Sequence, residues 1–591
     1  MIDHKKNIQE RVAFLYRQDQ TTDLMNSLWG RIERFKREHP QFKTKASTDD
    51  QLTEKDIILI TYADQFRASG RPPLESLNTF LQSRLQDVIS GVHILPFYPY
   101  SSDDGFSIID YRRVAPDLGT WQDIARLGEI FHLMFDLVAN HVSTESEWFQ
   151  NFLAGKQPYR DYFPVVDAGT DLSQVVRPRA TPLLTSFQTS DGLRHVWTTF
   201  STDQIDLDYR NPRVLLEMLD VLLFYVAHGA QIIRLDAIAY LWKIPGTTCI
   251  HLPQTHAVVK LFRAILDLVA PSVLLITETN VPHEENISYF GKYLSEIQRS
   301  DEAQLVYQFP LAPLVLHTFL TGNSTHLTDW AEGLPALPPG MAFFNFTASH
   351  DGIGVRPAEG LLQPDEVQAL IQSALAHGGQ VSYRTNPDGS QSAYELNITW
   401  YDALNDPADP EPELDVQRFL ASQAIMLALA GVPGIYVHSL LGSRNCLDCL
   451  AETGRARSIN REKFALAQLE EELNDPDSLK SRVLTGYHHL LDVRRRQSSF
   501  HPAAQQLVLK AGAEVFIVLR IAEDGSSLIC ITNVTASPLE IEIKPSEHGL
   551  PPNTTWVDQL SSKSFLAQNL LTIDLTPYQS RWLKANSQSR S

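Results

Sequence analysis

The sequence predicts an α/β fold, a closed parallel (β/α)8 barrel, from two observations. From Asp56 onward, short apolar runs alternate with amphipathic stretches of helical spacing, which is the pattern of repeated strand–helix units. The number of such runs matches the number of strands in this barrel. We expect the barrel to occupy residues 55–141 and 211–498. The runs, in order, are DIILITYA, VHILPF, LMFDLV, QIIRLD, VLLITE, LVYQF, AFFNF and PGIYV.

Four segments interrupt or flank this pattern. Residues 1–54 carry apolar positions at helical spacing and predict an N-terminal helical extension. Residues 142–210, after the third run, are rich in Pro, Asp, Thr and aromatic residues and predict a small inserted domain over the active face. A Pro/Gly/Asp-rich stretch after the seventh run predicts a second insertion over residues 355–415. Alternating apolar runs predict a C-terminal antiparallel β domain over residues 499–585.

Composition limits the possible partners. Seventy acidic residues against fifty basic residues give a formal net charge of -20, which argues against nonspecific binding to nucleic acid or to an anionic membrane. The N-terminus has no apolar core of signal length, and no run approaches the ~20 residues of a membrane span. We therefore expect a cytoplasmic protein with no nucleic-acid or membrane partner.

The cysteines suggest no metal or redox role. Cys446 and Cys449 have CxxC spacing, but no second pair and no nearby set of histidines completes a zinc site. We expect reduced thiols, and no cofactor or metal.

Three acids follow apolar runs where a strand should end: Asp236, Glu278 and Asp351. A single Asp in such a place is more often a helix cap or a turn residue. In a parallel barrel, however, these strand ends form the active face, so the ordered set favours catalysis. Retaining glycosyl transfer needs a carboxylate nucleophile and a second carboxyl that protonates the leaving oxygen and then deprotonates the acceptor.

The neighbours of each acid suggest its role. Arg234 precedes Asp236 by two strand positions and points to the same side, so it should keep Asp236 ionised as the nucleophile. Glu278 follows an apolar strand end that should raise its pKa, as a general acid/base requires. Asp351, between His350 and a glycine, is assigned to stabilising the transition state.

The motifs DLVANH, RLDAIAY, ITETN and SHDG resemble the four signature regions of the α-amylase clan, over roughly residues 56–500. Within that clan the stretches ITYAD, GVHILPFYPYSSDDGF, RPR, PGTTCIHLPQTH, HDGIGV and GRARSINR are similar to the sucrose phosphorylase subgroup. The N-terminal extension and the stretches SSDDGFSIIDYRRVAPDLG, FTASHDGIGVRPAEGLL and LLGSRN are similar to the glucosylglycerate phosphorylases.

The resemblance implies further site residues. Arg179 and Arg457 would lie in the pocket, whereas surface ion pairs compete as an explanation for Arg177, Arg444, Arg455 and Arg461. Tyr240 and Trp242 either stack on an acceptor or pack at the barrel edge. The loop that resembles the acceptor loop of the sucrose enzymes carries Ala393, Tyr394 and Glu395 in place of Leu, Tyr and Gln, which argues against fructose. The implied wall of the glucose pocket comprises Asp103, Phe106, His141, Gln204, Arg234, His350 and Arg457.

The implied activity is reversible phosphorolysis of 2-O-α-glucosylglycerate to α-glucose 1-phosphate and glycerate, with a small-molecule glucoside and inorganic phosphate as partners. Sucrose, sucrose 6-phosphate or glucosylglycerol phosphorylase, or an α-glucosidase or transglucosidase, are alternatives on the same scaffold. A noncatalytic, amylase-like transporter subunit is disfavoured because all three acids are present and no membrane span is predicted. Asn140 occupies a position at which some clan members bind calcium, but no acidic inserted loop accompanies it. The chain is a monomer or a homodimer, and the N-terminal extension either mediates a dimer or, as we favour, covers the bottom of the barrel.

Overall fold

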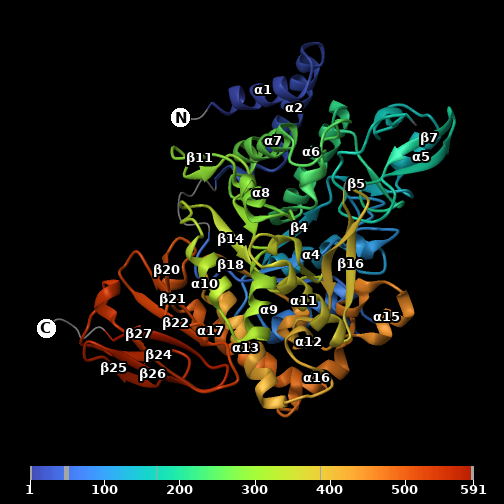
Figure 1. The fold of residues 1–591 in the computed structure, drawn as a ribbon. Helices are drawn as coiled ribbons and strands as arrows, with labels where there is room; N and C mark the ends of the chain where they lie inside the picture. The colour runs from blue at the N-terminus through green and yellow to red at the C-terminus, as the bar shows by residue number, and fades with distance from the viewer. Residues whose placement is uncertain (1–2, 45–51, 168, 387, 587–591) are drawn as a thin grey trace.

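The computed structural model describes residues 3–44, 52–167, 169–386 and 388–586 (Figure 1). Eight parallel strands form a closed barrel in which each strand pairs with the next along the chain, and the last pairs with the first. Each of the eight apolar runs overlaps one of these strands, so the predicted (β/α)8 barrel is confirmed. The strands are β1 (Ile58–Thr61), β3 (Gly91–Ile94), β4 (His132–Leu137), β9 (Ala230–Leu235), β10 (Leu274–Thr277), β13 (Leu305–Tyr307), β14 (Ala342–Asn345) and β18 (Val432–Tyr436).

The barrel strands are buried almost throughout, because side chains fill the interior and helices cover the outside. Proline is the first residue of four of the larger covering helices, α3, α6, α7 and α13, where its missing N–H costs no helical hydrogen bond. The larger covering helices are α3 (Pro73–Arg84), α4 (Trp121–Gly128), α6 (Pro212–Ala227), α7 (Pro253–Val269), α9 (Leu311–Thr321), α10 (Thr325–Glu332), α13 (Pro412–Ala428), α16 (Leu466–Asn474) and α17 (Leu479–Arg495).

The N-terminal extension forms two helices, α1 (His4–Leu15) and α2 (Gln18–Glu38). They pack on α6 and α7, on the side of the barrel (Figure 1). The Tyr16 hydroxyl donates to the carbonyl of Tyr209 at 2.9 Å, and Arg31 pairs with Asp220 at 2.9 Å. The preferred interpretation as a cover for the barrel bottom is therefore wrong, because the apolar face of the extension matches the flank formed by these two helices.

Between β4 and α6 the chain forms short elements close to the carboxyl ends of the barrel strands. Strands β5 and β8 pair antiparallel, so that His141 lies opposite Asp206 and Ser143 opposite Gln204. Phe149 packs edge to face against Phe187, at 4.9 Å between ring centroids. The elements are β5 (His141–Ser143), α5 (Glu147–Leu153), β6 (Leu184–Thr189), β7 (Gly192–Trp197) and β8 (Gln204–Asp206).

After β14 a second group of elements returns to the same end of the barrel. Its three strands form a sheet in the order β15, β17, β16, with Glu395 opposite Gly354. This register brings Glu395 close to the loop that carries Asp351. The elements are β15 (Ile353–Gly354), α11 (Pro364–Ala376), β16 (Gln380–Thr385), β17 (Gln391–Asn397) and α12 (Trp400–Leu404). The domain limits themselves stay predictions.

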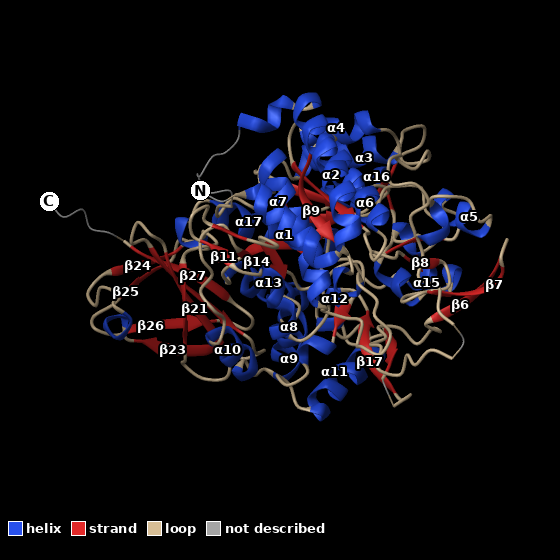
Figure 2. Cartoon of the chain, turned by 90° about the horizontal axis from the view of Figure 1, so that it is seen from above, coloured by secondary structure: helices blue, strands red, loops and turns tan. Residues whose placement is uncertain are grey.

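Antiparallel strands form the C-terminal part, which lies to one side of the barrel (Figure 2). Six strands make one sheet and two make another, and they enclose a second core around the fully buried Trp556. Among the described residues, no helix has the length and apolarity needed to cross a membrane. The strands are β20 (Gln505–Leu509), β21 (Val515–Ile521), β22 (Ser527–Asn533), β27 (Ser580–Ala585), β24 (Thr555–Asp558) and β25 (Ser564–Leu566), then β23 (Leu539–Ile543) and β26 (Leu571–Leu575).

One expectation about the cysteines is wrong. Cys446 and Cys449 form a disulfide at the start of α15 (Leu447–Thr453). Their Cα atoms are 5.2 Å apart, because the turn that starts the helix brings residues three apart within bridging distance. Cys249 and Cys530 are free and buried.

Candidate active site

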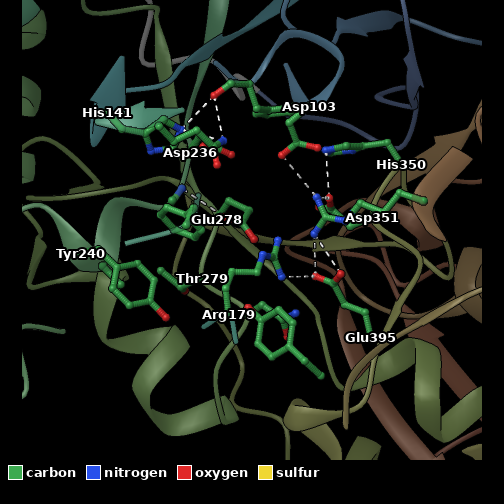
Figure 3. A pocket seen from close by; sticks show the side chains of 18 of the residues that line it. Asp103, His141, Arg179, Asp236, Tyr240, Glu278, Thr279, His350, Asp351 and Glu395 are labelled. Atoms are coloured by element: carbon green, nitrogen blue, oxygen red, sulfur yellow. Dashed lines mark hydrogen bonds and ion pairs between the residues drawn. The ribbon is translucent and has the colours of Figure 1, made fainter. Parts of the chain in front are cut away.

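The three predicted acids lie in one pocket at the carboxyl ends of the barrel strands (Figure 3). Asp236 directly follows β9 and Glu278 directly follows β10, while Asp351 lies in the loop after β14. Neighbouring parallel strands end at the same edge, so residues far apart in the sequence meet there.

Asp236 is 7% exposed and accepts a hydrogen bond from Arg234 Nη1 at 2.7 Å. The same guanidinium nitrogen also contacts the fully buried Asp136, which lies 2.6 Å from His93 Nε2. Burial raises the pKa of Asp236, and Arg234 offsets only part of this effect because Asp136 shares its charge. Arg234 acts toward the ionised form, as the sequence predicted, but burial outweighs it.

The residue after Asp236 has an unusual backbone conformation. Ala237 has a φ of 47°, in the left-handed region that costs a non-glycine residue on the order of 1–2 kcal/mol. Its N–H donates to Glu278 Oε2 at 3.1 Å. The turn after β9 therefore orients the neighbouring carboxyl.

Burial raises the pKa of Glu278 to about 7, and the nearby charges of Asp236 and Asp351 act in the same direction. The Arg234 guanidinium, 3.9 Å from Glu278 Oε2, opposes the shift without overcoming it. A carboxyl with a pKa near neutrality can both donate and accept a proton under ordinary conditions. The direction agrees with the prediction from the apolar strand end.

Asp351 is in the opposite electrostatic situation. Burial alone would raise its pKa, but the charges of Arg457, His350 and Arg461 hold the pKa below its ordinary range. Arg457 Nη1 is 2.7 Å from Asp351 Oδ1, and His350 Nε2 is 3.4 Å from the same oxygen. The pocket therefore contains one carboxyl near neutrality beside one that stays ionised.

Two arginines share one carboxylate on the side of the pocket formed by β17. Arg457 Nη2 donates to both oxygens of Glu395 at 2.9 Å, and Arg179 Nη1 lies 3.6 Å from Glu395 Oε1. The Arg179 guanidinium also lies over the ring of Tyr394, 5.3 Å from its centroid. Guanidinium groups recognise carboxylates and phosphates through paired donors, so this side of the pocket suits an anion.

Another part of the pocket wall is built from aromatic and amide groups. Phe106 stacks on His350 with ring centroids 4.8 Å apart. Gln204 Nε2 donates to the Phe106 carbonyl at 3.1 Å and lies 3.2 Å from His141 Nε2. Flat apolar faces beside fixed polar groups are typical of sugar pockets.

All the site residues predicted from the sequence line this pocket except Arg234, which is 2% exposed and lies behind Asp236. Trp242 packs against Tyr16, with centroids 6.2 Å apart, so of the two alternatives it adopts barrel-edge packing. The predicted residues that line the pocket are Asp103, Phe106, His141, Arg179, Gln204, Asp236, Tyr240, Glu278, His350, Asp351, Tyr394, Glu395 and Arg457.

The remaining arginines divide into two groups. Arg455 and Arg461 line an adjoining cavity at the pocket mouth. Arg177 donates to the carbonyl of Thr181, and Arg444 pairs with Asp402; neither lines the pocket or its mouth.

Sequence reasoning missed two groups of residues. Asp136 and His93 lie behind the pocket, and each stands out as a polar residue within an apolar run. Lys243 contacts Asn140 Oδ1 and Asp206 Oδ2, each at 2.7 Å. Its ammonium group therefore lies beside Asn140, the residue whose position binds calcium in some members of the α-amylase clan. The available signal was a lysine directly after the apolar stretch AIAYLW that follows the nucleophile.

The active face of this closed parallel barrel contains a buried aspartate, a glutamic acid with a pKa near 7 and a pair of arginines. These are the groups that an enzyme of retaining glycosyl transfer needs. Residues 85–330 match the model of the α-amylase catalytic domain. The chain is 48% identical to a glucosylglycerate phosphorylase of Allomeiothermus silvanus over 580 residues, which cover 98% of each chain. It is 44% identical to a glucosylglycerate phosphorylase of Escherichia coli, covering 98% of this chain and 100% of that protein. A solved structure of sucrose 6F-phosphate phosphorylase from Thermoanaerobacter thermosaccharolyticum has a TM-score of 0.69 at 26% identity, covering 81% of this chain and 94% of that one.

The chain belongs to the α-amylase family, in its branch of glucoside phosphorylases.

Proposed function

We propose that this protein is a glucosylglycerate phosphorylase, which transfers glucose reversibly between 2-O-α-glucosylglycerate and inorganic phosphate. The observation that carries the proposal is the 48% identity, over nearly the whole of both chains, to an enzyme of that name. The three acids in one pocket, with an anion-binding side next to them, support the same reaction.

In the first half-reaction, Asp236 attacks the anomeric carbon of the glucosyl group. The bond from that carbon to the glycerate oxygen breaks, and Glu278 gives its proton to the leaving oxygen. Its pKa of about 7 supports this role, because much of the group is protonated at neutral pH. The product is a glucosyl ester of Asp236 with inverted configuration, and glycerate leaves.

In the second half-reaction, a phosphate oxygen attacks the anomeric carbon from the face that glycerate has left. Glu278, now ionised, takes the phosphate proton, and the Asp236 ester bond breaks. Two inversions give net retention, so the product is α-glucose 1-phosphate. Asp351 is placed to stabilise the positive charge that develops on the sugar ring, because Arg457 and its neighbours keep it ionised.

Both acceptors are anions, although the protein carries a formal net charge of -20. Arg457 is engaged by both Glu395 and Asp351, whereas the Arg179 guanidinium has only a long contact with Glu395, at 3.6 Å. Arg179 is therefore the group that we assign to binding phosphate or the glycerate carboxylate. We also assign the segments 142–210 and 355–415 to closing over the pocket, because they supply Arg179 and Glu395.

The test is a comparison of donors. Purified protein with inorganic phosphate is incubated separately with 2-O-α-glucosylglycerate, sucrose, sucrose 6-phosphate and glucosylglycerol, and α-glucose 1-phosphate and free glucose are measured. We expect α-glucose 1-phosphate from glucosylglycerate at a kcat/KM well above that for the other donors. A higher kcat/KM for another donor would reassign the acceptor, and free glucose as the sole product would identify a hydrolase. The Asp236→Asn variant is the control for contaminating activity.

A cytoplasmic location and a monomeric or dimeric state stay predictions.

A further inference from the structure

A cluster of two histidines and a glutamate joins three helices outside the catalytic pocket. His317 lies on α9, His326 on α10 and Glu366 on α11. The Nε2 atoms of the two histidines lie 3.2 and 3.0 Å from the same oxygen, Glu366 Oε1. One ligand atom from each residue lies within 4.8 Å of the others, and no other group of this kind occurs among the residues that the structure describes.

These distances match the edges of a tetrahedral zinc site. Two ligands bound to one zinc ion at 2.0–2.1 Å and at the tetrahedral angle are about 3.3 Å apart. With no metal bound, the same distances fit hydrogen bonds from the two rings to Glu366 Oε1, so a zinc ion would take the place of the two ring protons. The other Glu366 oxygen, Oε2, accepts the Gln363 N–H at 2.8 Å, so the carboxylate is held by an outer contact as metal-binding carboxylates commonly are.

We propose that His317, His326 and Glu366 bind a divalent transition-metal ion, with zinc as the best match to two imidazoles and one carboxylate. The His317 side chain is 5% exposed, whereas those of His326 and Glu366 are 33% and 26% exposed. The site therefore has one buried ligand and two that solvent reaches, which gives the ion a route of entry and leaves a fourth position for water.

The position of the site suggests what the metal does. α9 and α10 cover the barrel, whereas α11 lies in the second group of elements and packs on β16 and β17. The β17 strand carries Glu395. The ion would thus link α11 of the second insertion to the barrel helices α9 and α10 and would disfavour local unfolding of the insertion. This role does not depend on which acceptor the enzyme uses.

The experiment uses full-length protein without an affinity tag, freed of metal by a chelator and titrated with zinc chloride in a calorimeter. We expect the wild type to bind one equivalent of zinc and to unfold at a higher temperature with zinc than without it. Cobalt at the same site should give the visible absorption of a four-coordinate ion.

Three variants distinguish a metal site from a hydrogen-bonded cluster. His326→Ala should lower zinc affinity by at least tenfold. Glu366→Gln keeps an oxygen for the Gln363 N–H, so it should fold normally and still lose zinc affinity, because a neutral amide is a poor zinc ligand. His256→Ala is the matched control. His256 lies 2.8 Å from the Glu302 carboxylate, but among the described residues this pair belongs to no group of three possible metal ligands.

The proposal is overturned if the wild type binds no zinc at micromolar concentrations. It is equally overturned if His326→Ala and Glu366→Gln bind zinc as tightly as the wild type, or if His256→Ala alone abolishes binding. Should His326→Ala fail to fold, Glu366→Gln decides the question.

Discussion

Glu278 should lower the stability of the folded protein at alkaline pH, and Glu278→Gln should remove that cost. Its pKa is raised from 4.5 to about 7 because burial disfavours the charged form, and only 15% of the side chain is exposed. The folded state therefore binds this proton more tightly than the unfolded state does. The resulting stabilisation is fully present below about pH 4.5 and is lost as the pH rises through about 7.

The size of the effect follows from the two pKa values. Relative to acid pH, an ionisable Glu278 lowers the free energy of unfolding by about 1 kcal/mol at pH 5 and by about 3 kcal/mol at pH 8. Glutamine does not titrate, so the variant should gain about 2–2.5 kcal/mol over the wild type between these two pH values. For a chain of 591 residues this corresponds to about 2 °C in the unfolding temperature.

The assay is thermal unfolding of both proteins at pH 5 and pH 8, with Glu284→Gln as control. Glu284 lies six residues further on and is exposed, so its variant should follow the wild type at both pH values. If the unfolding temperatures of Glu278→Gln and the wild type differed by the same amount at pH 5 and at pH 8, the reasoning would be refuted. The same variant should form little α-glucose 1-phosphate from a poor leaving group, because no proton is available for it.

Asp236→Asn should lower kcat by at least about 10⁴-fold in an α-glucose 1-phosphate assay, since no glucosyl ester can form; a loss of a few-fold would contradict the nucleophile assignment. Arg179→Ala should raise the KM for phosphate about tenfold or more with a smaller change in kcat, measured by initial rates against phosphate concentration, and an unchanged KM would remove Arg179 from the acceptor site. Asp136→Asn leaves the buried Arg234 charge without its main partner, so it should lower the free energy of unfolding by about 3 kcal/mol, measured by chemical denaturation. Unchanged stability would show that Asp236 alone compensates the charge of Arg234. The pH profile of kcat/KM should fall on its basic side near pH 7, where Glu278 loses its proton, and a profile that stays flat to pH 9 would exclude it as the acid.

The barrel was predictable because its signal is local. Each strand is a short run of apolar residues buried on both faces, and each run is separated from the next by amphipathic segments, so composition alone marks the elements. Two of the acids were predictable for the same reason, since Asp236 and Glu278 are the last residues of the runs QIIRLD and VLLITE, where a strand should end. The position of the N-terminal extension was not predictable, because an apolar helix face does not identify the surface it covers.

Residues behind the pocket depend on pairings that no local pattern shows. Asp136 and Arg234 become neighbours because β4 and β9 are adjacent and register Asp136 opposite Arg234. Sequence reasoning recognised the Arg234–Asp236 pair, which is local, and missed Asp136, which is not. Burial raises the pKa of Asp236, and Arg234 offsets this only in part, because one guanidinium between two buried carboxylates cannot stabilise both as fully as it would stabilise one.

The division of roles among the three acids is accordingly a property of the fold. Asp351 is kept ionised by Arg457, which comes from the segment after the last barrel strand and is itself held by Glu395 from β17. Glu278 receives a backbone N–H and a distant guanidinium, too little to offset its burial, so its pKa stays near 7. Glu278 follows β10 and Asp351 follows β14, at the same end of one barrel. The arginines that contact each acid come from other segments of the chain, and they determine which of the two acids carries a proton near pH 7. A change in those segments can therefore alter proton transfer without altering any of the three acids.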